Sequence, residues 1–568
     1  MNAQSRQPSA IDAVAEDYFD VQVALSPLLA TYLGIPGSEH RLDDCSIEAY
    51  RCDGELIAAT LKALDEAVAG YHPDSPMDAV DWVTQAALRD ELTLRATVND
   101  RVLEGIDPVP LNVLDCTVQS LRDVFDLMAT QTEQHWRWVL ARLQAVPGAL
   151  DDYAGALRYS ASRGAVAPKR QVISVGKQAA DQQAAQTSTY TALIGAADGI
   201  DPELRTALDE ATTAANAAYG ALADFLRDEL LEQAPDQDAV GIERYSLFSR
   251  GFLGTDVDLE QTYQWGQEEL ARITVMMRAC ADDIQPGASI AEAVEILDAD
   301  ERYQLSSTTA LQEWMQARAD QAIAELADAH FDIPEPVRTI ECKIAPSQTG
   351  IIYYTGPSED FTRPGRMWWS VPAGVTRFAT WRELTTVYHE GVPGHHLQVA
   401  QTTLRGDVLN RWRRLAAWTS GHGEGWALYA EWLMSDLGYL DDPGMRMGLL
   451  DAQSLRAARV VIDIGVHCEF EAPAEVGRGP WTYDKAWEFL NNHVNMDEGF
   501  VRFELDRYLG YPGQAPSYKI GERSWLELRD EVRQRDGDTF DLAAFHRRAL
   551  DIGGVGLDVL RSAVLGHA

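Results

Sequence analysis

The sequence predicts a mainly α-helical protein with one small β-sheet. Apolar residues recur at helical spacing through most of the 568 residues. One short region after Pro336 instead gathers β-branched and aromatic residues, with Gly and Pro between them. With 46% hydrophobic residues, a chain of this length can bury a large core.

Segments with helical spacing fill the first part of the chain. They cover residues 12–33, 46–69, 78–99, 111–146, 178–197, 201–231, 259–283 and 307–330. Gly and Pro interrupt the pattern at 34–37, 107–110 and 332–336, where we expect helices to end. The sequence therefore predicts a helical N-terminal region over residues 1–335.

The second region, residues 336–568, is expected to begin with a small antiparallel sheet. Its predicted strands are residues 337–344, 350–354 and 366–371. Helical spacing returns after this sheet and continues to the end of the chain. We expect the sheet to lie directly before the histidine-rich segment at residues 389–396.

Charge and cysteine content restrict the partners and the compartment. The net charge of −40 argues against binding to nucleic acid and to anionic membrane surfaces, because both would repel the chain. The six cysteines are scattered and form no CxxC pair, which is typical of reduced thiols in the cytoplasm. Residues 1–16 lack a signal-peptide pattern, and no run of about 18 apolar residues occurs. We expect a soluble cytoplasmic protein, whose oligomeric state the sequence leaves open.

The segment His-Glu-Gly-Val-Pro-Gly-His-His, residues 389–396, is the strongest chemical signal. Five of the 12 histidines lie between positions 389 and 467. A zinc hydrolase needs about three protein ligands, an open position for water and a base. The HExxH motif supplies two ligands and the base from one helix face. Here two extra residues separate the histidines.

A regular helix cannot make a metal site from this segment. The position four residues after His389 is Pro393, which binds no metal and interrupts the helix. His395 would lie about 240° around a regular helix from His389, and His396 about 10 Å further along its axis. The site forms only if residues 391–394 bulge from the helix, so that His395 begins the next helical stretch facing His389.

A third ligand is expected from a following helix. Glu424 lies 29 residues after His395 among glycines, and we predict that it binds the metal. Glu431 shares its helix face two turns later. It is the second choice, and we interpret it as a solvated surface carboxylate.

One helix further on carries Arg456, Arg459, Asp463 and His467 in a single stripe between strongly apolar residues. Such a stripe must be paired internally if it is buried. Two interpretations stay open: a structural network, or groups that assist the site. In the second, Asp463 orients His467, and His467 donates to a carbonyl or to a tetrahedral oxyanion.

Four motifs together resemble the bacterial family called domain of unknown function 885. They are HEGVPGHHLQ (389–398), EGWALYAE (424–431), LRAARVVIDIGVH (455–467) and ELDRYLGYPGQAPSYKIG (504–521), and residues 24–35 resemble the family's opening segment. That family is similar to gluzincin zinc peptidases of the thimet-oligopeptidase and Taq-carboxypeptidase type. The resemblance implies a large helical, channelled fold that admits short peptides, with residues 1–335 as one wall of the channel.

The resemblance also implies roles for single residues. Carried over position by position, His389, His395 and Glu424 are zinc ligands and Glu390 is the general base. The two inserted residues are the departure from the gluzincin pattern.

Further contacts are expected from the last motif and from the end of the first one. In gluzincins a tyrosine commonly bonds the oxyanion and an arginine can hold the peptide C-terminus. Tyr518 is the first candidate for the catalytic tyrosine, and Arg507 for the carboxylate clamp. Tyr511 and His396 are further candidates for substrate contacts.

These observations predict a zinc-dependent metallopeptidase that hydrolyses short peptides, with cleavage from the C-terminus as a narrower expectation. One Zn²⁺ is expected, and Mn²⁺ or Co²⁺ also suits two histidines and a carboxylate. Two alternatives remain. One is a metal-dependent amide or ester hydrolase of a small metabolite, and the other is an inactive helical binding protein with a hydrogen-bonded histidine core.

Overall fold

The computed structural model describes residues 6–72, 74, 76–347, 352–372 and 374–566. Helices make up most of this chain, which confirms the predicted fold class. The part of the chain before residue 335 contains helices α1 to α13. Their bounds are Ala10–Leu25, Pro27–Leu33, Ile47–Ala69, Ala79–Glu104, Thr117–Asp123, Glu133–Ala161, Lys169–Gln183, Thr189–Gly195, Pro202–Phe225, Ile242–Leu253, Leu259–Ile284, Ile290–Ala299 and Thr308–Leu326.

The second part contains the larger sheet and α14 to α22. The helices span Thr380–Glu390, His395–Thr403, Ser420–Asp436, Pro443–His467, Tyr483–His493, Glu498–Gly510, Ser517–Asp536, Leu542–Leu550 and Leu557–Leu565. Strands β1 to β5 are Gln304–Leu305, Ile340–Ile344, Ile352–Thr355, Gly365–Trp369 and Phe378–Ala379.

Three of the predicted helices are broken where a polar residue caps a new helix. The segment expected at 12–33 divides at Ser26, whose hydroxyl accepts from the Leu29 amide as the N-cap of α2. Thr132 caps α6 and Ser188 caps α8 in the same way. A hydroxyl inside an amphipathic pattern leaves the apolar spacing intact, so periodicity alone did not reveal these breaks.

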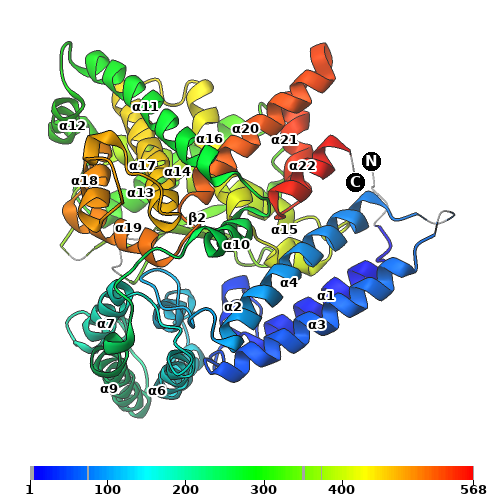
Figure 1. Cartoon of the computed structure of the whole chain (residues 1–568), viewed down its shortest axis with the longest axis vertical. Helices are drawn as coiled ribbons and strands as arrows, with labels where there is room; N and C mark the ends of the chain where they lie inside the picture. Colours follow the sequence, from blue (N-terminus) through cyan, green and yellow to red (C-terminus); the bar gives the residue numbers. More distant parts are fainter. Residues whose placement is uncertain (1–5, 73, 75, 348–351, 373, 567–568) are drawn as a thin grey trace.

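The helices form an upper and a lower group (Figure 1). The lower group consists of α1, α3 and α4 on one side and α6, α7 and α9 on the other, while α11 to α14 and α16 to α22 lie above. Helix α10 lies between the groups, and α11 packs along α17. Helices from both sides of residue 335 pack together in each of two core clusters.

The larger sheet has the order β2–β4–β3 and is mixed. β3 pairs antiparallel with β4, but β2 pairs parallel with β4. The prediction of a purely antiparallel sheet is therefore wrong for one pair. The chain reverses after β2 and again after β3, so β2 and β4 run the same way, and β4 enters the sheet between the other two. Residues 350 and 351 of the expected second strand lie outside the described residues.

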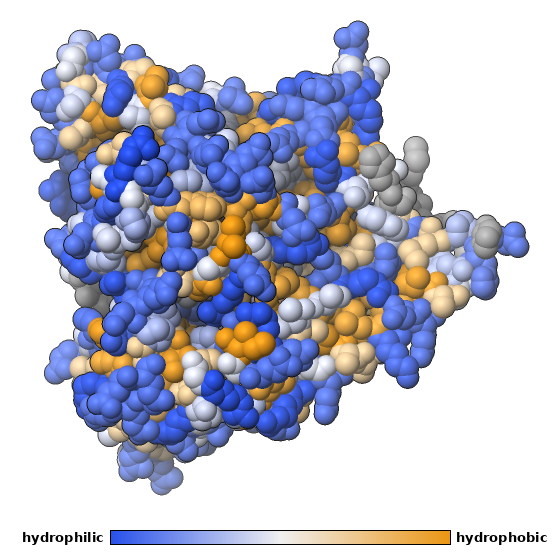
Figure 2. Space-filling view, in the orientation of Figure 1, coloured by the Kyte–Doolittle hydropathy of each residue, from blue (hydrophilic) through white to orange (hydrophobic). Residues whose placement is uncertain are grey.

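Two global features bear on the predicted compartment. Among the described residues, every helix is either too short or too polar to cross a membrane. All six cysteines are free thiols. Figure 2 shows hydrophilic residues over most of one face, with hydrophobic residues gathered towards its middle, between the upper and lower helix groups.

Candidate metal centre

The helix break that the sequence predicted is present between α14 and α15. α14 ends at Glu390 and α15 begins at His395. The link folds back on α14, where the Gly394 amide donates to the Tyr388 carbonyl at 3.1 Å. A Cβ added at Gly394 would overlap the His389 carbonyl, so only glycine fits this close approach. Trp426 of α16 fixes the link from the other side, because its Nε1 donates to the Pro393 carbonyl at 2.8 Å.

The two histidines on either side of the break face one carboxylate oxygen. The ring centroids of His389 and His395 lie 4.8 Å apart, with their planes nearly perpendicular. Glu424 Oε2 lies 3.2 Å from His389 Nε2 and 3.3 Å from His395 Nε2. The bulge thus brings together the three residues that the sequence singled out, and both histidines are buried.

Glu431 holds His389 in this orientation. His389 Nδ1 donates to Glu431 Oε1 at 2.8 Å, and the Thr385 hydroxyl donates to Glu431 Oε2 at 2.6 Å. The interpretation of Glu431 as a surface carboxylate is wrong, since it is 0% exposed. A carboxylate on the far nitrogen of a metal-binding histidine fixes the tautomer and leaves Nε2 free for the ion. The sequence signal for this contact is the seven-residue spacing between Glu424 and Glu431. This spacing puts both carboxylates on the face of α16 that packs against α14.

Glu390 adds a second carboxylate beside the histidine pair. Ligand atoms of His389, Glu390 and His395 all lie within 4.8 Å of one another. Glu390 is buried, and its Oε2 has no hydrogen-bond partner among the described residues. Burial raises the pKa of Glu390, and the nearby imidazoles oppose this rise. The histidine pair is therefore flanked by two carboxylates: Glu424 contacts both Nε2 atoms, and Glu390 lies beside the pair.

The electrostatics of the cluster favour a cation. Burial alone would lower the pKa of His389, but the hydrogen bonds to Glu424 and Glu431 outweigh it and raise that pKa to about 10. Burial would raise the pKa of Glu424, but the two imidazoles hold it well below its usual value. Glu390 and Glu431 are buried and Glu424 is partly buried, and Arg456 Nη2 lies 3.9 Å from Glu431. Two imidazoles and a carboxylate with this negative excess fit the ligand preference of Zn²⁺.

Tyr518 lies next to this cluster. Its ring stacks on that of His389, with centroids 6.4 Å apart and an interplanar angle of 15°. The guanidinium carbons of Arg459 and Arg507 lie 4.9 and 5.8 Å from the centroid of the same ring. Burial raises the pKa of Tyr518, so its hydroxyl remains a donor at neutral pH.

Arg507, the predicted carboxylate clamp, has partners within the protein. Its Nη2 donates to Gln514 Oε1 at 2.6 Å and its Nη1 to Glu504 Oε1 at 3.0 Å. A substrate carboxylate would have to displace Gln514 to use the same donors.

His467 does not join the cluster. Its Nε2 donates to the Tyr508 carbonyl at 2.9 Å, and its ring stacks on Tyr245. Asp463 accepts from the Tyr245 hydroxyl at 2.7 Å and does not orient His467. Of the two interpretations left open, these contacts fit the structural network, and the site roles predicted for Asp463 and His467 are corrected. Eleven helical residues separate Arg456 from His467, a rise of about 16 Å, so one stripe cannot bring both ends to one site.

His396 and Tyr511 are also placed elsewhere. His396 Nδ1 accepts from the Tyr354 hydroxyl at 2.9 Å, and its Nε2 donates to the Val337 carbonyl at 2.8 Å. The predicted substrate contact of His396 is therefore corrected: one nitrogen bonds to β3 and the other to the turn at residues 335–338, directly before β2. Tyr511 donates to Asp115 Oδ2 at 2.7 Å and packs edge-on against Phe252.

Several solved structures share this fold, including two proteins described provisionally as lipoproteins. A protein from Colwellia psychrerythraea, provisionally described as a lipoprotein, matches with a TM-score of 0.82 and 22% identity, over 98% of this chain and 99% of its own. A protein of unknown function from Shewanella oneidensis, described in the same provisional way, matches with a TM-score of 0.69 and 16% identity, over 98% of this chain and 100% of its own. At these identities the likeness concerns the fold alone.

A search of curated proteins gave no match. The family described as bacterial protein of unknown function (DUF885) matches residues 27–564, and the chain belongs to this family.

Proposed function

We propose that the protein is a metal-dependent hydrolase, and more specifically a zinc metallopeptidase that acts on short peptides. One observation carries the proposal. His389 and His395, separated by a helix break, turn their Nε2 atoms towards the same oxygen of Glu424, at 3.2 and 3.3 Å. Such convergence is expected of ligands that share one ion.

The ligand set that we propose is His389, His395 and Glu424. Glu424 is preferred to Glu390 because its oxygen contacts both Nε2 atoms, whereas Glu390 Oε2 is left without a partner among the described residues. A bound Zn²⁺ would polarise the scissile carbonyl and lower the pKa of its water to about 7. Mn²⁺ and Co²⁺ suit the same ligands.

The surrounding side chains have separate tasks in this proposal. Glu390 accepts the proton of the attacking water and passes it to the leaving amine, as a buried carboxylate with a raised pKa can do. Glu431 keeps His389 in one tautomer. The Tyr518 hydroxyl donates a hydrogen bond to the oxyanion, since the Tyr518 ring lies beside His389.

Metal analysis of protein purified without added zinc tests the proposal most directly. We expect about one equivalent of metal per chain, and loss of that metal in a His395→Ala variant. His467→Ala is the matched control, because this buried histidine lies outside the cluster. An inactive binding protein with a hydrogen-bonded histidine core predicts well under one equivalent in the unaltered chain.

The substrate class needs a separate measurement. Hydrolysis of a mixture of short peptides supports peptidase action, whereas metal binding with turnover of small amides or esters alone favours a metabolite hydrolase. Cleavage from the C-terminus is the narrower part of the proposal and gives Arg507 the role of carboxylate clamp. Equal cleavage of free and C-terminally amidated peptides would contradict that part.

We also propose that the protein acts in the cytoplasm, with neither nucleic acid nor membrane as a partner. The six free thiols and the net charge of −40 support this. The lipoprotein descriptions of the two structural neighbours favour the cell envelope instead. Fractionation of cells with an antibody to the native chain distinguishes these locations.

A further inference from the structure

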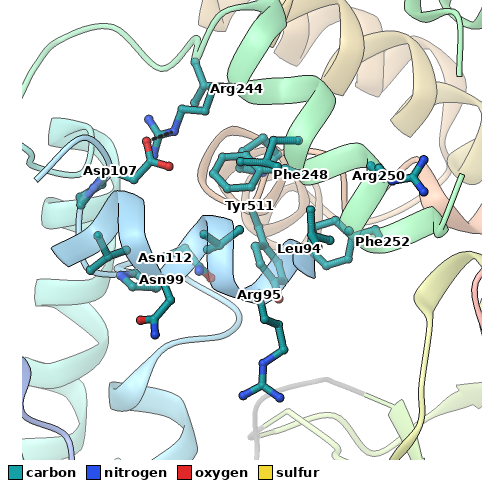
Figure 3. Close-up of a pocket in the computed structure, with 18 of the residues that line it drawn as sticks. Leu94, Arg95, Asn99, Asp107, Asn112, Arg244, Phe248, Arg250, Phe252 and Tyr511 are labelled. Atoms are coloured by element: carbon teal, nitrogen blue, oxygen red, sulfur yellow. Dashed lines mark ion pairs between the residues drawn. The ribbon is translucent and has the colours of Figure 1, made fainter. Parts of the chain in front are cut away.

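A cavity of about 640 Å³ lies between α4, α10 and residues 509–512. Figure 3 shows the side chains of Leu94, Phe248, Phe252 and Tyr511 grouped together in its lining. Leu94, Phe248 and Phe252 are only half-buried, since they face this space. The volume falls within the roughly 300–1,000 Å³ of typical small-molecule sites.

The charged residues of the lining are paired within the protein. Arg95 lies 2.7 Å from Asp53, Arg244 2.8 Å from Asp107, and Arg250 2.8 Å from Asp90. The two remaining acids of the lining each lie within 3.6 Å of an arginine. A charged ligand would have to break one of these pairs, whereas an apolar ligand would only cover the aromatic and aliphatic walls.

Trp418 connects this cavity to the metal centre. It lines the cavity, and its ring centroid lies 5.7 Å from that of His395. A Cβ added at Gly423 would overlap the Trp418 ring, so the indole rests on the first turn of α16, directly before Glu424. Although large and apolar, Trp418 is 48% exposed. It therefore forms a wall that the cavity shares with the metal centre.

We propose that this cavity is a subsite for a large apolar or aromatic side chain of the substrate, next to the bond that is cleaved. The inference rests on the proposed function, because it places the reacting bond at the His389–His395 pair. The shared Trp418 wall sets the distance between that pair and the subsite. Paired charges around apolar walls then select neutral side chains over acidic and basic ones.

Selectivity among peptides is the first test. In a series that differs at one position only, we expect kcat/KM for the phenylalanine peptide to exceed that for the alanine peptide roughly tenfold to a hundredfold. Acidic and basic side chains should rank below alanine. Phe252→Arg, which brings a charge into the cavity, should reduce the phenylalanine-to-alanine ratio towards one. Val275→Arg is the matched control, because Val275 is 63% exposed and lies outside the lining.

Direct binding is the second test and needs no turnover. Calorimetric titration of the metal-stripped protein with N-acetyl-phenylalaninamide and N-acetyl-alaninamide should show roughly tenfold tighter binding of the former. Phe252→Arg should abolish the difference, and Val275→Arg should keep it. Circular dichroism and thermal unfolding of both variants establish that they fold.

The outcomes separate the two proposals. Peptide cleavage without any preference for apolar side chains overturns the subsite and leaves the peptidase standing. Binding of the phenylalanine amide in a protein that cleaves no peptide overturns the peptidase and leaves an apolar binding site. Equal binding of the two amides overturns the subsite, whatever the activity.

Discussion

Two polar regions inside this protein contain the same kinds of side chain but shift their pKa values in opposite directions. The proposed metal-binding cluster (His389, Glu390, His395, Glu424 and Glu431) raises the pKa of His389 to about 10 and depresses that of Glu424. The α17 network is Tyr245, Asp463, His467 and Tyr508. There, burial lowers the pKa of His467 to about 4 and raises that of Asp463 to about 7.

The difference comes from the partners and not from the depth of burial. In the proposed metal-binding cluster each imidazole faces a carboxylate, so the charged forms are favoured. In the α17 network the imidazole meets a backbone carbonyl, and the carboxyl meets a phenol and a backbone amide. The partners there are all neutral, so burial favours the uncharged forms. A buried histidine near a carboxylate in sequence therefore indicates a site only if the two side chains meet.

The sharpest test of this contrast is the proposed base. Glu390→Gln should lower kcat by about 10²–10⁴-fold and keep the metal, because only the proton acceptor is lost. Glu383→Gln, an acid-to-amide change in the same helix and outside the cluster, is the matched control. Full activity of the Glu390 variant would remove this residue from the mechanism.

A smaller effect is expected at the tyrosine of each region. Tyr518→Phe should reduce kcat by about 10²–10³-fold, since it removes one oxyanion donor. Tyr245→Phe removes the hydroxyl that bonds Asp463 and should affect stability but not turnover. Similar kinetic losses in both variants would show that the tyrosines act through folding.

The role of Glu431 gives a third test. Glu431→Gln should weaken metal affinity about 10- to 100-fold, because the amide is a poorer acceptor for His389 Nδ1. Competition with a chelator of known affinity measures this change. Unchanged affinity would show that Glu431 only fills space between α14 and α16.

The last test concerns pH and the α17 network, and its effect is on stability and not on turnover. Folding raises the pKa of Asp463 to about 7, so its contribution to the free energy of unfolding is complete below the unfolded pKa of about 4 and is lost as pH rises to 7. His467, with a folded pKa of about 4, contributes above the unfolded pKa of about 6.5 and loses this as pH falls. Asp463→Asn removes the first contribution alone.

Urea unfolding of both proteins between pH 4 and 8 measures the effect. The stability of the Asp463→Asn variant relative to the unaltered chain should rise with pH, by up to roughly 1.4 kcal/mol per pH unit between pH 4 and 7. A difference that stays constant with pH would mean that Asp463 is ionised throughout.

Local sequence rules predicted the helical fold and the helix break. Pro393 and the two glycines excluded a regular helix, and the bulge brought His389 and His395 together as expected. The rules failed where a contact depends on a second element. Glu431 lacked a visible partner in sequence, and the stripe from Arg456 to His467 gave no sign that its ends meet different neighbours.

The position of β4 in the sheet also depends on long-range packing. The sequence pattern predicts which residues form strands, but it does not predict that β4 lies between β2 and β3. The caps at Ser26, Thr132 and Ser188 belong to a simpler class of error, because a hydroxyl followed by a helical stretch is visible in the sequence.

Because α14 and α15 are separate helices, the proposed ion would stabilise the fold as well as take part in the reaction. In an HExxH helix both histidines belong to one element, whose own hydrogen bonds hold their spacing. Here the proposed ligands come from α14, α15 and α16, so a bound ion would tie three helices together. Since such an ion binds only the folded arrangement, a concentration 100-fold above its Kd would stabilise the chain by about 2.7 kcal/mol. The melting temperature would then report the zinc concentration around the protein.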